Sequence, residues 1–270
     1  GSLFRIASLS KPLTAVAVLR LAEDGKLSLA SRALDVLEES TLSGPAGPAN
    51  GTLAALPAPA DPRFRDITIL HLLQHTAGFD RDRSFDPMFR SVDIARALAV
   101  EPPVRPEHVI RYMLGQPLDF APGERHAYSN FGYCLLGRVI EKVSGKDYER
   151  HVREEILAPL GIRRVRIGRS LKEGRAPGEV AYHAKGDATG PAVVGAVGSP
   201  VPWQYGGWCL ESMDAHGGWV ASAVDLARFA AALDGSARSM ILSPRSLEVL
   251  FARPAGRAGH EENGSPSPAF

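Results

Sequence analysis

A serine and a lysine stand three residues apart near the start of the chain, as Ser8 and Lys11. At this spacing a helix carries both side chains on one face, so the hydroxyl and the ammonium can meet. A serine attacks a carbonyl only when a neighbour accepts its proton, and a partly desolvated lysine can help in this. A serine cap followed by a solvated lysine has the same spacing. The apolar helix that follows favours the catalytic interpretation, because a solvated lysine fits poorly there.

The segment Tyr128-Ser129-Asn130 is a second candidate group. A phenol beside an ammonium can act as a base for the serine or for a water molecule, and an asparagine amide can bind a substrate carbonyl. The alternative is a turn before a helix, in which Asn130 caps the helix and Tyr128 packs on the core.

Other site classes fit the sequence less well. His71 and His75 have a spacing that suits a metal, but no glutamate follows His71 as in H-E-x-x-H. The absence of a G-x-S-x-G segment disfavours an α/β-hydrolase triad. Cys134 and Cys209 lie in no C-x-x-C pattern and are expected to be buried free thiols. We therefore expect neither a metal nor another cofactor.

The composition is that of an ordinary globular protein. Apolar residues make up 44% of the 270 residues, and 31 Lys and Arg nearly balance 30 Asp and Glu. No basic run is interleaved with aromatic residues, so a nucleic-acid partner is not expected. No stretch approaches the roughly 20 apolar residues that span a bilayer, and the first residues show no export signal.

Helices are expected around the candidate residues. Apolar residues at 13–21 surround the helical wheel and predict a central buried helix. Further predicted elements are helices at 68–75, 131–143 and 147–157, a strand at 164–167, a helix from the capping box of Ser222 and Asp225 through Leu233, and a helix opened by Ser243 and Pro244 through Phe251. Gly and Pro predict irregular loops at 43–62 and 173–207, and the chain after Arg253 is polar and loop-like.

Four segments resemble, in order, the signature segments of the penicillin-recognising serine hydrolases, which include class C β-lactamases, D,D-carboxypeptidases and related esterases. They are F-R-I-A-S-L-S-K-P-L-T-A, L-L-Q-H-T-A-G-F, P-G-E-R-H-A-Y-S-N-F-G-Y-C-L-L-G-R-V-I-E-K-V-S-G and G-G-W-V-A-S-A-V-D-L-A-R-F. The resemblance implies that Ser8 is the nucleophile and Lys11 its partner. It also implies that Tyr128 is the general base and that Asn130 contacts the substrate and the lysine.

The resemblance implies an α+β, β-lactamase/transpeptidase-like fold, in which an antiparallel sheet flanked by helices adjoins a mainly helical domain. Residues 1–60 are then part of the α/β domain, 61–175 the helical domain, and 176–270 a loop region that returns to the α/β domain. The chain is expected to lack flanking strands of that sheet.

The sequence departs from the family at a third motif, in which Lys or His, a small residue and Gly follow the last of the four segments. His216-Gly217-Gly218 has the pattern H-x-G but lies inside that segment. His216 is therefore a candidate for the substrate-binding role of this motif, and the alternative is a loop histidine near the site.

Together these residues predict a serine hydrolase that forms an acyl-enzyme on an ester, amide or β-lactam carbonyl of a small molecule or peptide. The resemblance favours esters and peptides over β-lactams as substrates. The alternative is a non-catalytic binding or scaffold protein that retains the fold. The resemblance favours an extracytoplasmic location, and the oligomeric state stays open.

Overall fold

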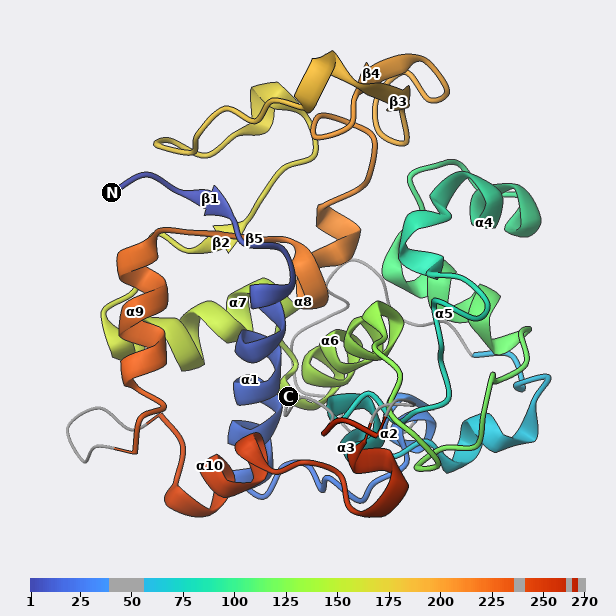
Figure 1. The fold of residues 1–270 in the computed structure, drawn as a ribbon, viewed down its shortest axis with the longest axis vertical. Helices are drawn as coiled ribbons and strands as arrows, with labels where there is room; N and C mark the ends of the chain where they lie inside the picture. The colour runs from blue at the N-terminus through green and yellow to red at the C-terminus, as the bar shows by residue number, and fades with distance from the viewer. Residues whose placement is uncertain (39–55, 236–240, 261–263, 267–270) are drawn as a thin grey trace.

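The computed structural model describes residues 1–38, 56–235, 241–260 and 264–266. Two long helices, α1 (Lys11–Glu23, blue) and α6 (Asn130–Ser144, green), pack against each other at its centre (Figure 1). Within α1, every residue from Leu13 to Leu21 except Arg20 is buried, because apolar side chains point in all directions from the axis. The prediction of a central buried helix is confirmed.

Shorter helices surround this pair (Figure 1). They are α2 (Ala33–Glu38), α3 (Ile69–Leu73), α4 (Ser91–Leu98), α5 (Pro106–Leu114), α7 (Tyr148–His151), α8 (Asp214–Gly217), α9 (Ala223–Ala231) and α10 (Pro244–Phe251). The backbone continues from α7 through a π-helical stretch, Val152–Leu157, which confirms the predicted helix at 147–157. No helix of the described ranges is long and apolar enough to cross a membrane.

Polar side chains at the helix ends explain most boundaries. The predicted capping box of Ser222 and Asp225 is present, although α9 ends two residues before Leu233. Ser243 caps α10 as predicted. The predicted helix at 68–75 is too long, because α3 ends at Leu73 and His75 has a φ of 56°, in the left-handed region that ends a right-handed helix.

A small antiparallel sheet joins distant parts of the chain. Its strands are β1 (Phe4–Arg5), β5 (Trp219–Ala221) and β2 (Arg166–Ile167), in the order β1-β5-β2. The predicted strand at 164–167 is thus two residues long in the structure. Because β1 precedes Ser8 and β5 follows His216, the pairing brings these two segments side by side (Figure 1).

The segment between β2 and α8 projects beyond the sheet (Figure 1, top). The prediction of a loop at 173–207 is wrong in one respect, since it contains a hairpin of β3 (Thr189–Pro191) and β4 (Pro200–Pro202). The sequence does not predict this hairpin, because prolines, which are rare inside strands, occupy three of its strand positions. Of the predicted loop at 43–62, residues 43–55 lie outside the described residues, 56–61 have no regular structure, and Pro62 begins a 3-10 helix.

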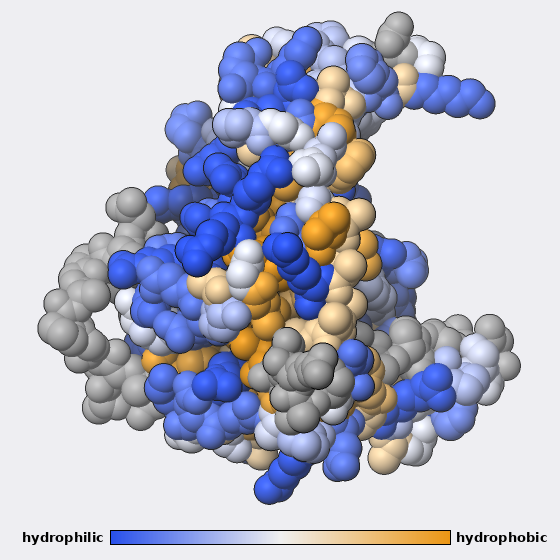
Figure 2. All heavy atoms as spheres, turned by 90° about the vertical axis from the view of Figure 1, so that its left-hand side faces the viewer, coloured by the Kyte–Doolittle hydropathy of each residue, from blue (hydrophilic) through white to orange (hydrophobic). Residues whose placement is uncertain are grey.

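Apolar surface is left uncovered on the side that carries β1, α9 and α10. Figure 2 shows an apolar band running down this face between polar margins. Phe4 of β1, Val224 of α9 and Phe251 of α10 keep 48%, 57% and 60% of their surface exposed. The exposed part of these side chains therefore contributes no hydrophobic stabilisation.

A buried ion pair fixes α8 against α6. Arg138 of α6 is 5% exposed, and its Nη2 donates to Asp214 Oδ2 at 2.5 Å. The helices approach so closely that a Cβ built on Gly137 would lie 2.7 Å from Cβ of Ala215. Cys134 on the same helix and Cys209 are buried free thiols, as predicted.

We predict that Gly137→Ala destabilises the protein by about 1–3 kcal/mol, because its methyl group would push α8 away from α6. Gly132→Ala on the same helix is the matched control, since its Cβ would meet its nearest neighbour at 3.6 Å. Urea unfolding of both variants measures the difference. Equal stabilities would show that α8 moves aside freely.

Candidate active site

Ser8 lies in a 3-10 turn, Ala7–Ser10, that leads into α1. The preceding residue, Ala7, has a φ of 46°, a conformation that costs a non-glycine residue free energy. Ser8 itself is exposed, so a dissolved molecule can reach its hydroxyl. Trp219 of β5 accepts a backbone hydrogen bond from Ile6 at 3.0 Å, which holds this strained turn beside the sheet.

Lys11 is the first residue of α1 and is only 4% exposed. Its Nζ donates to Ser8 Oγ at 3.3 Å and to Tyr128 Oη at 2.5 Å. It also donates to Asn130 Oδ1 at 2.7 Å and to the main-chain oxygen of His216 at 3.1 Å. The ammonium therefore has four oxygen neighbours and almost no water.

Burial dominates the protonation of this lysine. Desolvation lowers the pKa of Lys11 from its ordinary 10.5 to about 7. The negative charge of Asp86 opposes this effect, and the positive charge of Arg81 adds to it. Lys11 can therefore exchange a proton near neutral pH, as a base system requires.

Tyr128 stands directly between the serine and the lysine. Its Oη shares a hydrogen bond of 2.6 Å with Ser8 Oγ. The ring stacks on His75 with centroids 4.7 Å apart, and the guanidinium of Arg81 lies 4.5 Å from its centroid. These contacts hold the phenol by its face and leave the oxygen directed at the serine.

His75 supports the tyrosine as a neutral ring. Its Nδ1 accepts a hydrogen bond from Ser129 N at 3.1 Å, and burial lowers its pKa to about 3. His71 Nδ1 accepts from Thr68 N at 3.2 Å within the cap of α3. Both imidazoles thus bind the backbone, and the described residues contain no group of three or more metal-binding side chains.

Asn130 is the first residue of α6, and its cap is Ser129, whose Oγ accepts from Gly132 N at 3.1 Å. Ser129 rather than Asn130 therefore caps α6, and the Asn130 amide is free to contact Lys11. His216 contributes its main-chain oxygen to the site, while its ring is buried and 3% exposed. Burial lowers the pKa of this ring well below its usual value.

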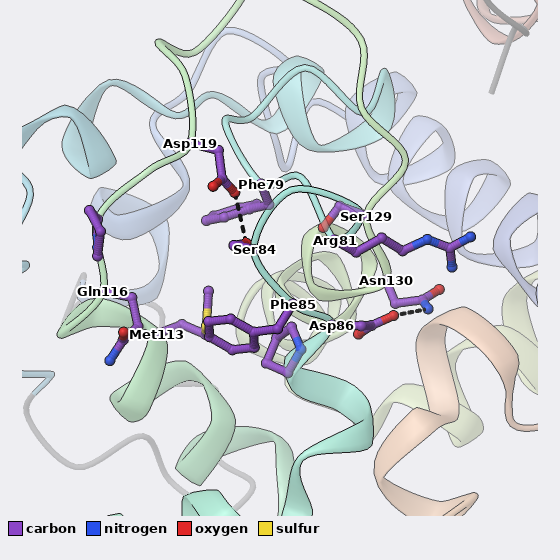
Figure 3. Close-up of a pocket in the computed structure, with 12 residues that line it drawn as sticks. Phe79, Arg81, Ser84, Phe85, Asp86, Met113, Gln116, Asp119, Ser129 and Asn130 are labelled. Atoms are coloured by element: carbon purple, nitrogen blue, oxygen red, sulfur yellow. Dashed lines mark hydrogen bonds between the residues drawn. The ribbon is translucent and has the colours of Figure 1, made fainter.

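Two charged residues near the site belong to none of the sequence motifs. Arg81 and Asp86 line a cavity of about 120 Å³ together with Asn130, and apolar residues such as Phe79 and Phe85 form part of its other walls (Figure 3). Asp86 Oδ2 accepts a hydrogen bond from Asn130 Nδ2 at 2.6 Å. The segment 80–90 has neither periodicity nor a motif, so only the structure reveals these neighbours.

The sequence-predicted residues Ser8, Lys11, Tyr128 and Asn130 thus converge in one hydrogen-bonded cluster. The cluster joins an accessible hydroxyl to a phenol and a desolvated amine, a combination suited to moving a proton away from the hydroxyl. The α+β fold is that of the β-lactamase-like proteins, the class that the sequence motifs around this cluster resemble.

Comparison with known proteins agrees with this class. A family model described as Beta-lactamase matches residues 1–263, and the chain belongs to this family. The FimD protein of Dichelobacter nodosus serogroup H1, named for fimbrial assembly, is 38% identical over 149 residues, 55% of this chain and 31% of that protein. Penicillin-binding protein 4* of Bacillus subtilis strain 168 is 30% identical over 169 residues, 62% of this chain and 31% of that protein.

A solved structure extends the similarity to the whole chain. The octameric penicillin-binding protein homologue from Pyrococcus abyssi has a TM-score of 0.63 and 25% sequence identity, and the match covers 99% of this chain and 52% of that one. The fold is thus β-lactamase/transpeptidase-like. The chain spans about a third of the length of the relatives it matches in sequence.

We predict a pH-dependent stability that comes from Lys11. Because its pKa falls on folding, the folded state binds fewer protons between pH 7 and 10.5, and folding becomes more favourable as the pH rises through this window. Below pH 7 the cost of burying the ammonium is fully present. Relative to Lys11→Met, the wild type should therefore gain about 2–4 kcal/mol between pH 6 and pH 10.5. Urea unfolding of both proteins at several pH values measures this, and a constant difference would contradict the lowered pKa.

Proposed function

We propose that this chain carries the catalytic site of a serine hydrolase that works through an acyl-enzyme, with Ser8 as the nucleophile. The contact that supports this most directly is the 2.6 Å hydrogen bond between Ser8 Oγ and Tyr128 Oη, with Lys11 Nζ donating to both oxygens. A nucleophile, a proton acceptor and a cation that stabilises the acceptor are thus in contact.

The acylation step follows from this geometry. Ser8 Oγ forms a bond to the carbonyl carbon of the substrate while its proton passes to the oxygen of Tyr128. Lys11 stabilises negative charge on the phenol oxygen, and backbone N–H groups stabilise the oxyanion that develops on the carbonyl. The bond to the leaving group then breaks, and the leaving group takes the proton from Tyr128.

Water completes the reaction. Tyr128 accepts a proton from a water molecule while the water oxygen attacks the acyl carbon. The proton then passes from Tyr128 to Ser8 Oγ as the ester bond breaks. Asn130 and His216 are proposed to contact the substrate or the lysine during both steps. Of the two, Asn130 is better placed, because its side chain rather than its main chain reaches the cluster.

Esters and small peptides or amides are the proposed substrates, ahead of β-lactams. An exposed Ser8 accommodates any of these carbonyl groups, and a relative named as a putative D-alanyl-D-alanine carboxypeptidase supports peptides among them. The extracytoplasmic location expected from the sequence resemblance is part of this proposal. The competing function, a non-catalytic scaffold with the same fold, requires none of the contacts of Lys11 with Ser8 and Tyr128.

We predict that Ser8→Ala abolishes covalent labelling by a fluorophosphonate or a fluorescent penicillin, with the modified peptide identified by mass spectrometry. Removing one exposed hydroxyl should leave the thermal melt nearly unchanged. Ser10→Ala is the matched control, because Ser10 lies in the same turn but its Oγ accepts from Trp219 N at 3.3 Å. Undiminished labelling of Ser8→Ala would remove Ser8 as the nucleophile, and an unlabelled wild type would favour the scaffold.

We predict that Tyr128→Phe lowers kcat by about 10²- to 10⁴-fold and leaves KM nearly unchanged, the usual result of losing a positioned acid or base. The ring would keep its stacking on His75, so the loss isolates the hydroxyl. Tyr112→Phe on α5 serves as the control. Steady-state hydrolysis of a chromogenic ester measures both constants, and unchanged kinetics would leave Tyr128 with a packing role only.

A further inference from the structure

We infer that Asp86 is a positioning residue of this site, whose carboxylate turns the side-chain amide of Asn130 so that its oxygen faces Lys11. The inference concerns a residue outside every sequence motif, and its catalytic consequence rests on the proposed function. Asp86 does not touch the reacting atoms and acts through Asn130.

The hydrogen bonds on the two ends of the amide carry the inference. Asn130 Nδ2 donates to Asp86 Oδ2 at 2.6 Å (Figure 3), and Asn130 Oδ1 accepts from Lys11 Nζ at 2.7 Å. An ionised carboxylate only accepts hydrogen bonds, and an ammonium only donates them. If the amide were flipped, its NH₂ would face the ammonium, and both groups are donors. Its oxygen would face the carboxylate, and both groups are acceptors. Asn130 is 6% exposed, so water cannot relieve such a mismatch.

Asp86 is itself held in place. Its other oxygen, Oδ1, accepts from Met88 N at 3.1 Å and caps the 3-10 turn Pro87–Phe89. Earlier in the same loop, Asp80 N and Ser84 Oγ both donate to Asp119 Oδ2, at 2.9 and 3.0 Å. The carboxylate is thus presented by a loop that is anchored at two points.

The charge of Asp86 reaches the lysine as well. Burial is the largest influence on the pKa of Lys11 and lowers it, Asp86 raises it, and Arg81 lowers it. Several titratable or charged groups surround Lys11. They are Tyr128 and the stacked His75, Tyr133 of α6, His216 of α8, and Arg81 and Asp86 of the segment before the turn Pro87–Phe89. Removing the charge of Asp86 should therefore lower the pKa of Lys11 further.

The amide orientation can be tested without any substrate. The chain contains three asparagines, Asn50, Asn130 and Asn263, so selective ¹⁵N-asparagine labelling gives few side-chain signals. Asp86→Asn keeps the cap of the turn, because asparagine caps as well as aspartate. The new NH₂ group at position 86 would, however, face the NH₂ group of Asn130, and neither group can accept a hydrogen bond. We expect the Asn130 amide pair to move relative to its position in the wild type. An unmoved Asn130 pair would overturn the inference.

Activity supplies the second arm of the experiment. Asp86→Asn should lower kcat by about 10- to 100-fold and move the Lys11-dependent limb of the pH profile to lower pH. Asp93→Asn is the charge-matched control, since Asp93 is 55% exposed and pairs only with Arg90 and Arg96 among the described residues. Equal profiles for wild type and Asp86→Asn would exclude the positioning role.

An exchanged pair separates positioning from general damage to the fold. In Asp86→Asn with Asn130→Asp, an amide again donates to a carboxylate, and that carboxylate can again accept from Lys11. The Lys11-dependent limb of the pH profile should return to the wild-type pH or to a higher one. Asn130→Asp alone places two carboxylates next to each other. Failure of the exchange to restore the limb would contradict the inference. A wild type that no probe labels at Ser8 would instead defeat the proposed function, and the amide signals would still decide the role of Asp86.

Discussion

The ammonium of Lys11 is withdrawn from water at a point where oxygen atoms from three parts of the chain meet. These atoms belong to Ser8 in the turn before α1, to Tyr128 and Asn130 at the start of α6, and to His216 in α8. A buried cation is tolerated only when such partners surround it. The positions of these elements relative to one another are therefore tied to one charge, and its lowered pKa results from the same burial.

A second layer of buried contacts maintains this arrangement. Thr14, one turn after Lys11, donates to the main-chain oxygen of Ala215 at 2.6 Å and shares a hydrogen bond of the same length with Tyr148 Oη. Trp219 Nε1 donates to the same phenol at 3.0 Å. With the ion pair of Arg138 and Asp214, these bonds connect α1, α6, α7, α8 and β5 around the site. Buried polar networks of this kind favour a single core arrangement.

The accuracy of the sequence predictions follows the range of the interactions involved. The buried helix α1 and the caps of α9 and α10 were predicted correctly, because they depend on neighbours within one turn. The end of α3 was misplaced, since His75 leaves the helix to accept from Ser129, 54 residues away. The hairpin of β3 and β4 was missed because prolines disguise its strands.

For the site, the sequence by itself determined that Ser8 and Lys11 are within reach of each other, since three residues make about one helical turn. The chemistry of their side chains made Tyr128 and Asn130 candidates, and the motif resemblance assigned their roles. Only the tertiary structure decided that these two meet Lys11, 117 and 119 residues away in the chain. It also decided that Asp86 holds the amide of Asn130 across 44 residues. The physical reason is that local spacing specifies local geometry, whereas contacts between distant segments exist only once the helices have packed and excluded water.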